Sequence, residues 1–199
     1  MPEHEPGLDR RLADAIERLG NGLRALSQRS ARTQGLSPLQ QHAVLSLSRQ
    51  PAPRREVNAL AAEFDVTTPT MSDAVSALER KGLLTRSPGS DGRRRLLTLT
   101  DRGFQVSAEL SAWDAQLVGS LAALPETDRA TTLHTLLRVI ADLQRGGAIS
   151  VARVCTTCRF FGPDEHPDPR APHHCHLMRK PLALTELRTD CPEHAQATA

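Results

Sequence analysis

The sequence has very few aromatic residues, at 3% of its 199 positions, with one Trp, four Phe and no Tyr. Small-molecule enzyme pockets usually have aromatic walls, so this scarcity disfavours a small-molecule catalyst. Charge of one sign is also not in excess, since 25 Lys and Arg stand against 23 Asp and Glu for a formal net charge of +2. A general basic coat is therefore excluded, and any contact with nucleic acid must come from a local basic patch.

Long hydrophobic runs are absent as well. No apolar stretch approaches the roughly 20 residues that a membrane-spanning helix needs. The N-terminal residues MPEHEPGLDR are charged and lack the apolar core of a secretory signal. We therefore expect a cytoplasmic protein with no membrane partner, in which cysteine thiols stay reduced.

What the sequence does contain is mainly helical spacing of apolar residues. This spacing predicts a first helix over 8–32, and Ser37-Pro38 is typical of the start of a second, which ends before Pro51. Further helices are predicted over 55–64, from Thr67 or Thr68 to about Lys81, over 100–124, and from 126 to about 144. Gly82 stands where a glycine ends a helix.

One short β-hairpin interrupts these helices. Residues 83–86 and 96–99 are strand-like, and the turn-rich segment 87–92 separates them. The order helix, tight turn, helix, hairpin is that of a winged helix-turn-helix, in which the second helix enters the major groove of DNA. We thus predict a mainly α fold with a small β-hairpin wing.

The predicted helix from Thr67 or Thr68 to about Lys81 and the wing that follows it carry residues suited to DNA. Short polar side chains let a helix approach base edges and phosphates, and an arginine at a wing tip suits a narrow minor groove. The alternative is an amphipathic helix beside a solvated basic hairpin, but the order of the elements favours DNA binding. The candidate DNA-binding residues are Thr67, Thr68, Thr70, Ser72, Asp73, Ser76, Arg80, Lys81, Arg86, Asp91, Arg93, Arg94 and Arg95.

The stretch from Leu36 to Thr100 resembles the MarR family of transcriptional regulators. The matching segments are LSPLQQHAVLSL, VNALAAEFDVTTPTMSDAVSALERKGLLTR and the wing DGRRRLLTLTDRG. Asp91 and Arg93 fall on the positions where the family has an Asp–Arg pair, which the resemblance implies stiffens the wing. The resemblance extends over the flanking helices to about Gln144.

The resemblance implies a homodimer that binds a pseudo-palindromic operator in double-stranded DNA, most often as a repressor that responds to a small-molecule or redox effector. Residues 1–35 and 101–147 are then dimerisation regions, 36–100 the DNA-binding domain and 148–199 an extension. The apolar residues offered to a partner are Leu12, Ile16, Leu133, Leu136, Leu137, Ile140 and Leu143. The alternative is that these side chains pack within one chain.

Four cysteines mark the extension, which typical family members lack. Cys155, Cys158, Cys175 and Cys191 have the spacing C-x2-C-x16-C-x15-C. The extension has little apolar content, so a bound metal would supply folding energy. A four-thiolate zinc site and an iron–sulfur cluster are about equally favoured, because Pro192 follows the last cysteine and Phe160-Phe161 would shield a cluster. A metal-free thiol switch is the third interpretation.

The sequence therefore predicts a DNA-binding regulator with a metal site that senses metal or redox state. One alternative is that the extension only braces the protein or docks a protein partner. A metal-dependent enzyme is less favoured, because four thiolates leave no open position for water. Neither a Gly-rich phosphate loop nor a His-Glu-x-x-His motif occurs in the sequence.

Overall fold

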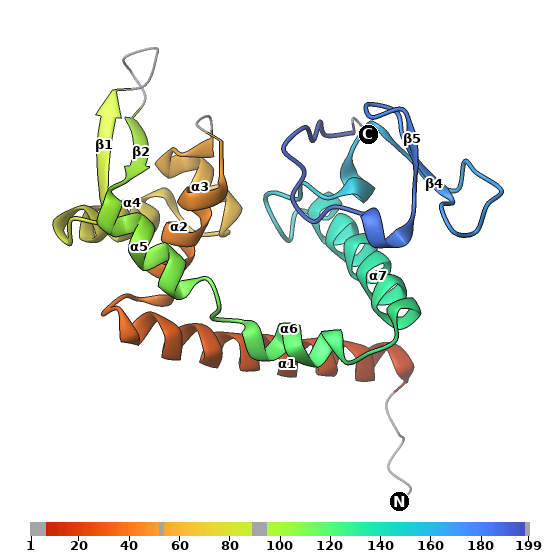
Figure 1. The fold of residues 1–199 in the computed structure, drawn as a ribbon, viewed down its shortest axis with the longest axis horizontal. Coiled ribbons are helices and arrows are strands. Elements are labelled where there is room, and N and C mark those ends of the chain that lie inside the picture. Colours follow the sequence, from red (N-terminus) through yellow and green to blue (C-terminus); the bar gives the residue numbers. More distant parts are fainter. Residues whose placement is uncertain (1–6, 52–53, 89–94, 198–199) are drawn as a thin grey trace, which may run out of the picture. The chain divides into compact units, whose positions relative to one another are not determined.

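The computed structural model describes residues 7–51, 54–88 and 95–197. The described part is mostly helical and carries one small antiparallel hairpin, which confirms the predicted fold class (Figure 1). The chain divides into two compact units, which we describe separately. The first comprises Met1–Leu60 and Thr68–Val118, and the second comprises Ala61–Thr67 and Gly119–Ala199.

Two helices open the first unit. Helix α1 spans Leu8–Thr33 and α2 spans Pro38–Arg49. The start of α2 follows from its sequence: the Ser37 hydroxyl accepts the Gln40 backbone N–H, and the Gln40 side chain accepts the Ser37 backbone N–H. This reciprocal capping satisfies donors that the first helical turn leaves unpaired. Proline at the first helical position completes the predicted start.

Helices α3 (Val57–Glu63) and α4 (Thr68–Arg80) follow, joined by a short turn. Asp65 in that turn has φ 49°, a left-handed conformation that aspartate tolerates better than most residues. One stripe of α4 is buried, formed by Met71, Ala74, Val75 and Leu78. Its polar residues are thereby directed to the other faces of the helix.

A glycine with a positive φ allows the turn from α4 into the hairpin. Gly82 has φ 69°, which allows the chain to leave α4 and enter β1 (Leu84–Pro88). Strand β1 pairs antiparallel with β2 (Arg95–Leu99), with Leu84 opposite Leu99. The Leu97 N–H donates to the Arg55 carbonyl at 2.7 Å, so the hairpin is also bonded to the residues just before α3.

The single helix predicted over 100–124 is wrong. The structure has α5 (Asp101–Leu110) and α6 (Ala115–Ala122), with turn residues between them. The Ser111 hydroxyl donates to the Ala108 carbonyl at 2.7 Å, a side-chain bond that competes with continued helix. Trp113 in the turn packs edge-on against the His42 ring of α2, with centroids 5.2 Å apart. This long-range contact is invisible in the local periodicity.

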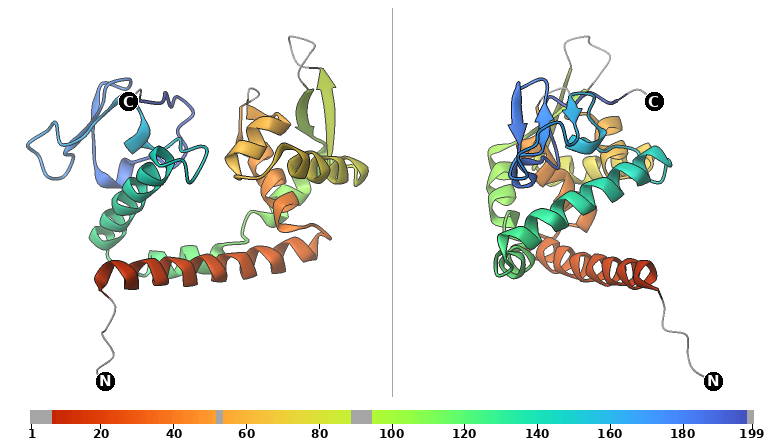
Figure 2. Two further views of the ribbon diagram at one scale, coloured as in Figure 1. Left: turned by 180° about the vertical axis from the view of Figure 1, so that it is seen from behind. Right: turned by 90° about the vertical axis from the view of Figure 1, so that its right-hand side faces the viewer.

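The second unit is built on α7 (Glu126–Arg145). Beyond it come the short helices η2 (Cys155–Thr157) and η3 (Leu184–Glu186) and the strands β3 (Phe161–Gly162), β4 (His173–Cys175) and β5 (Lys180–Leu182), which form one antiparallel sheet. Figure 2 shows these elements from two further sides. Their buried core combines Leu137 of α7 with Ala152, Val154, Leu182 and Leu187.

The cysteine-bearing extension therefore gains an apolar partner from α7, which its own composition did not reveal. Leu137 is 1% exposed, and Leu133 and Ile140 pack partly buried against the same core. These three residues, offered above to a second subunit, pack within the chain instead. Among the described helices, none is both long and apolar enough to cross a bilayer.

Candidate nucleic-acid interface and cysteine site

The exposed face of α4 carries the polar residues that the sequence singled out. Thr68, Thr70, Asp73 and Arg80 are exposed, whereas Ser72 and Ser76 are half-buried. Thr67 is exposed in the turn just before the helix. The helix thus presents short hydroxyls and one terminal cation opposite its buried stripe, an arrangement that can lie against a nucleic-acid groove.

Two of the predicted cations are held by protein groups. The Arg86 guanidinium donates to the Ser76 hydroxyl at 2.7 Å, and its Nε lies 3.2 Å from Glu79 Oε2 in an ion pair without hydrogen-bond alignment. Arg86 and Ser76 therefore fasten β1 to α4. Lys81 donates to the Gly35 carbonyl and to Gln40 Oε1, which fastens the end of α4 to the start of α2. Both side chains position the helix.

The wing supplies the remaining candidates. Arg95 is exposed at the start of β2, close to the hairpin tip. Asp91, Arg93 and Arg94 lie outside the described residues, as does the Asp–Arg pair implied by the resemblance. The described part of the wing thus offers one exposed arginine next to the tip, on the same hairpin whose base contacts α4 through Arg86.

The comparisons with known proteins agree with this geometry. A family model described as MarR family matches residues 34–95, the segment from α2 into the hairpin. This segment is therefore similar to the winged-helix domain of MarR-family regulators. A search of curated proteins gives no significant match.

Solved structures support the same assignment of fold. The transcriptional regulator PA3341 is 25% identical with a TM-score of 0.60, covering 67% of this chain and 98% of its own. The MepR–DNA complex of S. aureus is 20% identical with a TM-score of 0.59, covering 66% and 97%. BldR from Sulfolobus solfataricus is 24% identical with a TM-score of 0.56, covering 70% and 99%. These neighbours are regulators rather than enzymes, and about a third of this chain extends beyond each match.

The four cysteines of the extension line one cavity. Cys155, Cys158, Cys175 and Cys191 all line a space of about 30 Å³, although the first and the last are 36 positions apart in the sequence. Each side chain is half-buried, and none forms a disulfide. Apolar side chains close the surroundings, among them Phe160, Phe161, Leu177, Met178 and Leu182. The four cysteines thus line a common cavity, and a metal ion bound by them stays a prediction.

The four thiols do not form a preorganised metal site. Within the described ranges, no three His, Cys, Asp or Glu side chains already stand as a set that could hold a metal ion. Burial raises the pKa of the Cys155 thiol, the other three cysteines raise it further, and the hydrogen bond from Arg188 N–H lowers it. Four thiolates brought together would repel one another, and a divalent cation relieves that repulsion.

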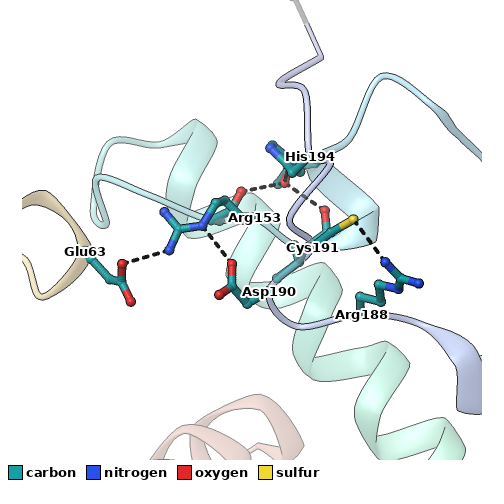
Figure 3. A network of polar contacts seen from close by, with 9 residues as sticks. Glu63, Arg153, Arg188, Asp190, Cys191 and His194 are labelled. Carbon is teal, nitrogen blue, oxygen red and sulfur yellow. Dashed lines mark hydrogen bonds and ion pairs between the residues drawn. The ribbon is translucent and has the colours of Figure 1, made fainter. Parts of the chain in front are cut away.

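Two hydrogen-bond donors of Arg188 approach the sulfur atoms. The Arg188 N–H donates to Cys155 Sγ at 3.2 Å. The Arg188 guanidinium donates to Cys191 Sγ at 3.7 Å (Figure 3). Such donors stabilise the charged form of a thiol, which is the form that binds metal. Sequence reasoning missed Arg188, because nothing in its local pattern shows which sulfurs it approaches.

A second arginine that sequence reasoning missed stands beside this site. Arg153 donates to Asp190 at 2.7 Å and to Glu63 at 2.8 Å (Figure 3). Its backbone carbonyl accepts the Cys191 N–H at 2.9 Å. Arg153 therefore joins the segment that carries Cys191 to Glu63, the last residue of α3, and its partners lie 37 and 90 residues away in sequence.

Proposed function

We propose that this protein acts as a homodimeric repressor of the MarR type that binds a pseudo-palindromic operator. The observation that carries the proposal is the exposed hydroxyl-bearing face of α4, backed by a buried stripe and followed directly by the hairpin. The MepR structure named above is a complex with DNA, and it shares this fold. By that analogy, α4 lies in the major groove and the hairpin on flanking DNA.

Exposed apolar side chains support the dimer. Leu8, Leu12, Ile16 and Leu19 repeat at helical spacing along α1 and are 49–63% exposed. Leu136, Val139 and Leu143 of α7 are 39–45% exposed. Contiguous apolar surface of this kind is rare on monomers and is covered in obligate dimers. The partner we infer is a second copy of the chain, as the pairing of two reading heads on a palindrome requires.

Operator binding is tested with DNA from the promoter beside the protein's own gene. Arg80→Gln removes an exposed cation at the end of α4, and we expect weaker binding on every sequence and a salt slope reduced by about one phosphate contact. The matched control is Arg102→Gln, an exposed arginine of α5, which should leave affinity unchanged. If the wild-type chain binds this DNA without salt dependence, the proposal fails.

We also propose that Cys155, Cys158, Cys175 and Cys191 bind a single Zn²⁺ ion. The cavity of about 30 Å³ exceeds the roughly 10–15 Å³ that one water molecule needs, which suits one ion. An iron–sulfur cluster holds several atoms and would need the surrounding loops to move apart. Four thiolates are a usual ligand set for structural zinc, and they close the site to catalysis.

Two contacts of the extension support a sensory role for this site. The Ser150 N–H donates to Asp65 Oδ1 at 2.7 Å, and Arg153 donates to Glu63. Both acceptors belong to residues 61–67, the segment that leads into α4. Losing the ion frees Cys155 and Cys191, whose backbones bond to Arg188 and Arg153. We expect this loss to loosen the segment just ahead of α4 and lower operator affinity.

Metal content decides between the forms of this proposal. Purified without oxygen, the protein should be colourless with one zinc per chain, and Cys175→Ser should lose most of it. His176→Ala is the control and should keep its zinc, because four thiolates already complete the ligand set. If the protein is brown and contains iron and sulfide, the four cysteines hold an iron–sulfur cluster and the zinc proposal is wrong. Unchanged operator affinity after chelation would leave the extension as a structural brace.

A further inference from the structure

A second, larger cavity lies between α7 and the cysteine-bearing extension. Its volume is about 540 Å³, within the range of roughly 300–1,000 Å³ typical of small-molecule sites. One wall is a face of α7 that carries His134, Arg138 and Arg145. The opposite wall comes from the extension and includes Phe161 and His173. The cavity is therefore distinct from the winged helix and contained in the second unit.

His173 gives this cavity a buried donor. The residue is 1% exposed, and its Nδ1 accepts the Asp164 backbone N–H at 3.1 Å. An accepting Nδ1 carries no proton, so in the neutral ring the proton is on Nε2. Nε2 is then a buried N–H, and it has no hydrogen-bond partner among the described residues.

This tautomer selects the chemistry of an occupant. A metal ion needs an unprotonated ring nitrogen, but Nε2 carries the proton and Nδ1 is already used, so a cation is disfavoured. A ligand oxygen that accepts a hydrogen bond satisfies Nε2. The nearest aromatic neighbours are the rings of His134 and Phe161, with centroids 5.0 and 5.1 Å away. His134 is only half-buried, so its ring can turn to admit an oxygen.

The charges on the wall point to an anionic oxygen. Arg145 is paired with Asp142, and Asp164 is near the Nδ1 side of His173. Arg138 is exposed and makes no ion pair or hydrogen bond within the described part of the chain. Its guanidinium is thus available at the wall, while Phe161, Pro163 and Ala141 supply apolar surface. A ligand that matches both parts of the wall has one anionic end and an apolar body, as a small organic carboxylate does.

We propose that this cavity binds a small organic carboxylate, with Arg138 pairing the carboxylate and His173 Nε2–H donating to one of its oxygens. Cys158 and Phe161 line both this cavity and the four-cysteine cavity, so an occupant lies beside the proposed metal site. The inference deepens the proposed function, since it gives the chemical class of an effector. Direct binding is measured without DNA, so its failure is separate from failure of operator binding.

The test is calorimetric titration of the full-length protein, as purified with its metal, with hexanoate. Hexanoate should bind, whereas hexanamide, which lacks the charge, should bind at least roughly tenfold more weakly. Arg138→Gln should weaken hexanoate binding by roughly 10- to 100-fold. The matched control is Arg129→Gln, an exposed arginine of the same helix that does not line the cavity, and it should bind as the wild type does.

A second readout follows the buried histidine. On saturation with hexanoate, the imidazole signal of His173 should shift in a nitrogen–proton NMR spectrum, and it should not shift in Arg138→Gln at the same concentration. Hexanoate binding that is equal in the wild type and Arg138→Gln would overturn the proposal. So would binding of inorganic phosphate that is tighter than that of hexanoate, because the apolar wall would then play no part.

Discussion

Substituting Gly103 by alanine should damage the base of the wing. Gly103 lies in the first turn of α5, where an added Cβ would stand 2.0 Å from the Leu83 carbonyl oxygen and 3.2 Å from the Leu99 Cβ. That carbonyl cannot move freely, because it accepts the Thr100 N–H at 3.1 Å. The clash therefore falls on backbone that joins α4, the hairpin and α5.

The magnitude follows from two opposing effects. Overpacking a buried position costs about 1–3 kcal/mol or more, and a clash with fixed backbone belongs at the upper end. The higher helix propensity of alanine over glycine offsets at most about 1 kcal/mol of this loss in the free energy of unfolding. We expect Gly103→Ala to lower the free energy of unfolding by about 2 kcal/mol and to weaken operator binding, because the hairpin is displaced.

Urea unfolding followed by circular dichroism measures the first effect and titration with operator DNA the second. The matched control is Gly22→Ala in α1, where nothing lies within 4 Å of the added Cβ. That change should stabilise the chain by about 0.5–1 kcal/mol. If Gly103→Ala unfolds at the same or higher urea concentration than the wild type, the close packing of α5 on Leu83 is wrong.

Three further predictions concern buried or half-buried polar groups. Gln41 is fully buried, and its amide finds no hydrogen-bond partner among the described residues. Gln41→Met should therefore raise the urea midpoint of unfolding by an amount equivalent to about 1–2 kcal/mol. A lower midpoint would contradict this. Burial lowers the pKa of His42 in the folded chain, so the unfolded chain takes up this proton at a higher pH than the folded chain does. The free energy of unfolding should therefore fall as the pH drops below about 6.5. His42→Gln should flatten this pH dependence when unfolding is measured from pH 8 to 5. Arg153→Met should remove the ion pair to the half-buried Glu63 carboxylate and destabilise the second unit, seen as faster proteolysis of the extension. Arg159→Met, whose guanidinium lies over the Phe160 ring, should have a smaller effect.

Local signals in the sequence were sufficient for most helix starts and turns. Ser37, Pro38 and Gln40 form the expected cap because all of its donors and acceptors lie within four residues. Gly82 ends α4 with a positive φ for a reason that belongs to glycine itself. The hairpin was likewise predictable from alternating residues around a turn-rich segment.

Contacts between distant residues could not be predicted in this way. The turn between α5 and α6 depends on Trp113 meeting His42, which is 71 positions earlier. The sequence predicts Arg86 as a DNA contact, but it could not show that the guanidinium also meets Ser76 and Glu79. The cavity lined by Arg138 and His173 needs α7 and the extension to be packed together. Periodicity describes one element at a time, whereas each of these features belongs to two.

The extension is attached within its unit by two chemically different sets of contacts. One is the apolar core of Leu137, Leu182 and Leu187 with Ala152 and Val154, which does not involve the thiols as hydrogen-bonding groups. The other is the polar set at Arg153, Arg188 and Asp190 around Cys155 and Cys191. If the proposed Zn²⁺ binds, its loss should weaken the second set and leave the first, because burial of apolar surface does not depend on a bound ion.

A chelated protein should therefore keep β5 and η3 packed on α7 while the segments around Cys155 and Cys191 exchange their amide hydrogens faster. If residues 61–67 also lose protection, the signal reaches the segment ahead of α4 through Glu63 and Asp65. If their protection is unchanged, the ion stabilises the extension alone. Hydrogen exchange thus separates a sensor from a brace in one measurement, since both depend on the same ion but only the sensor transmits its loss.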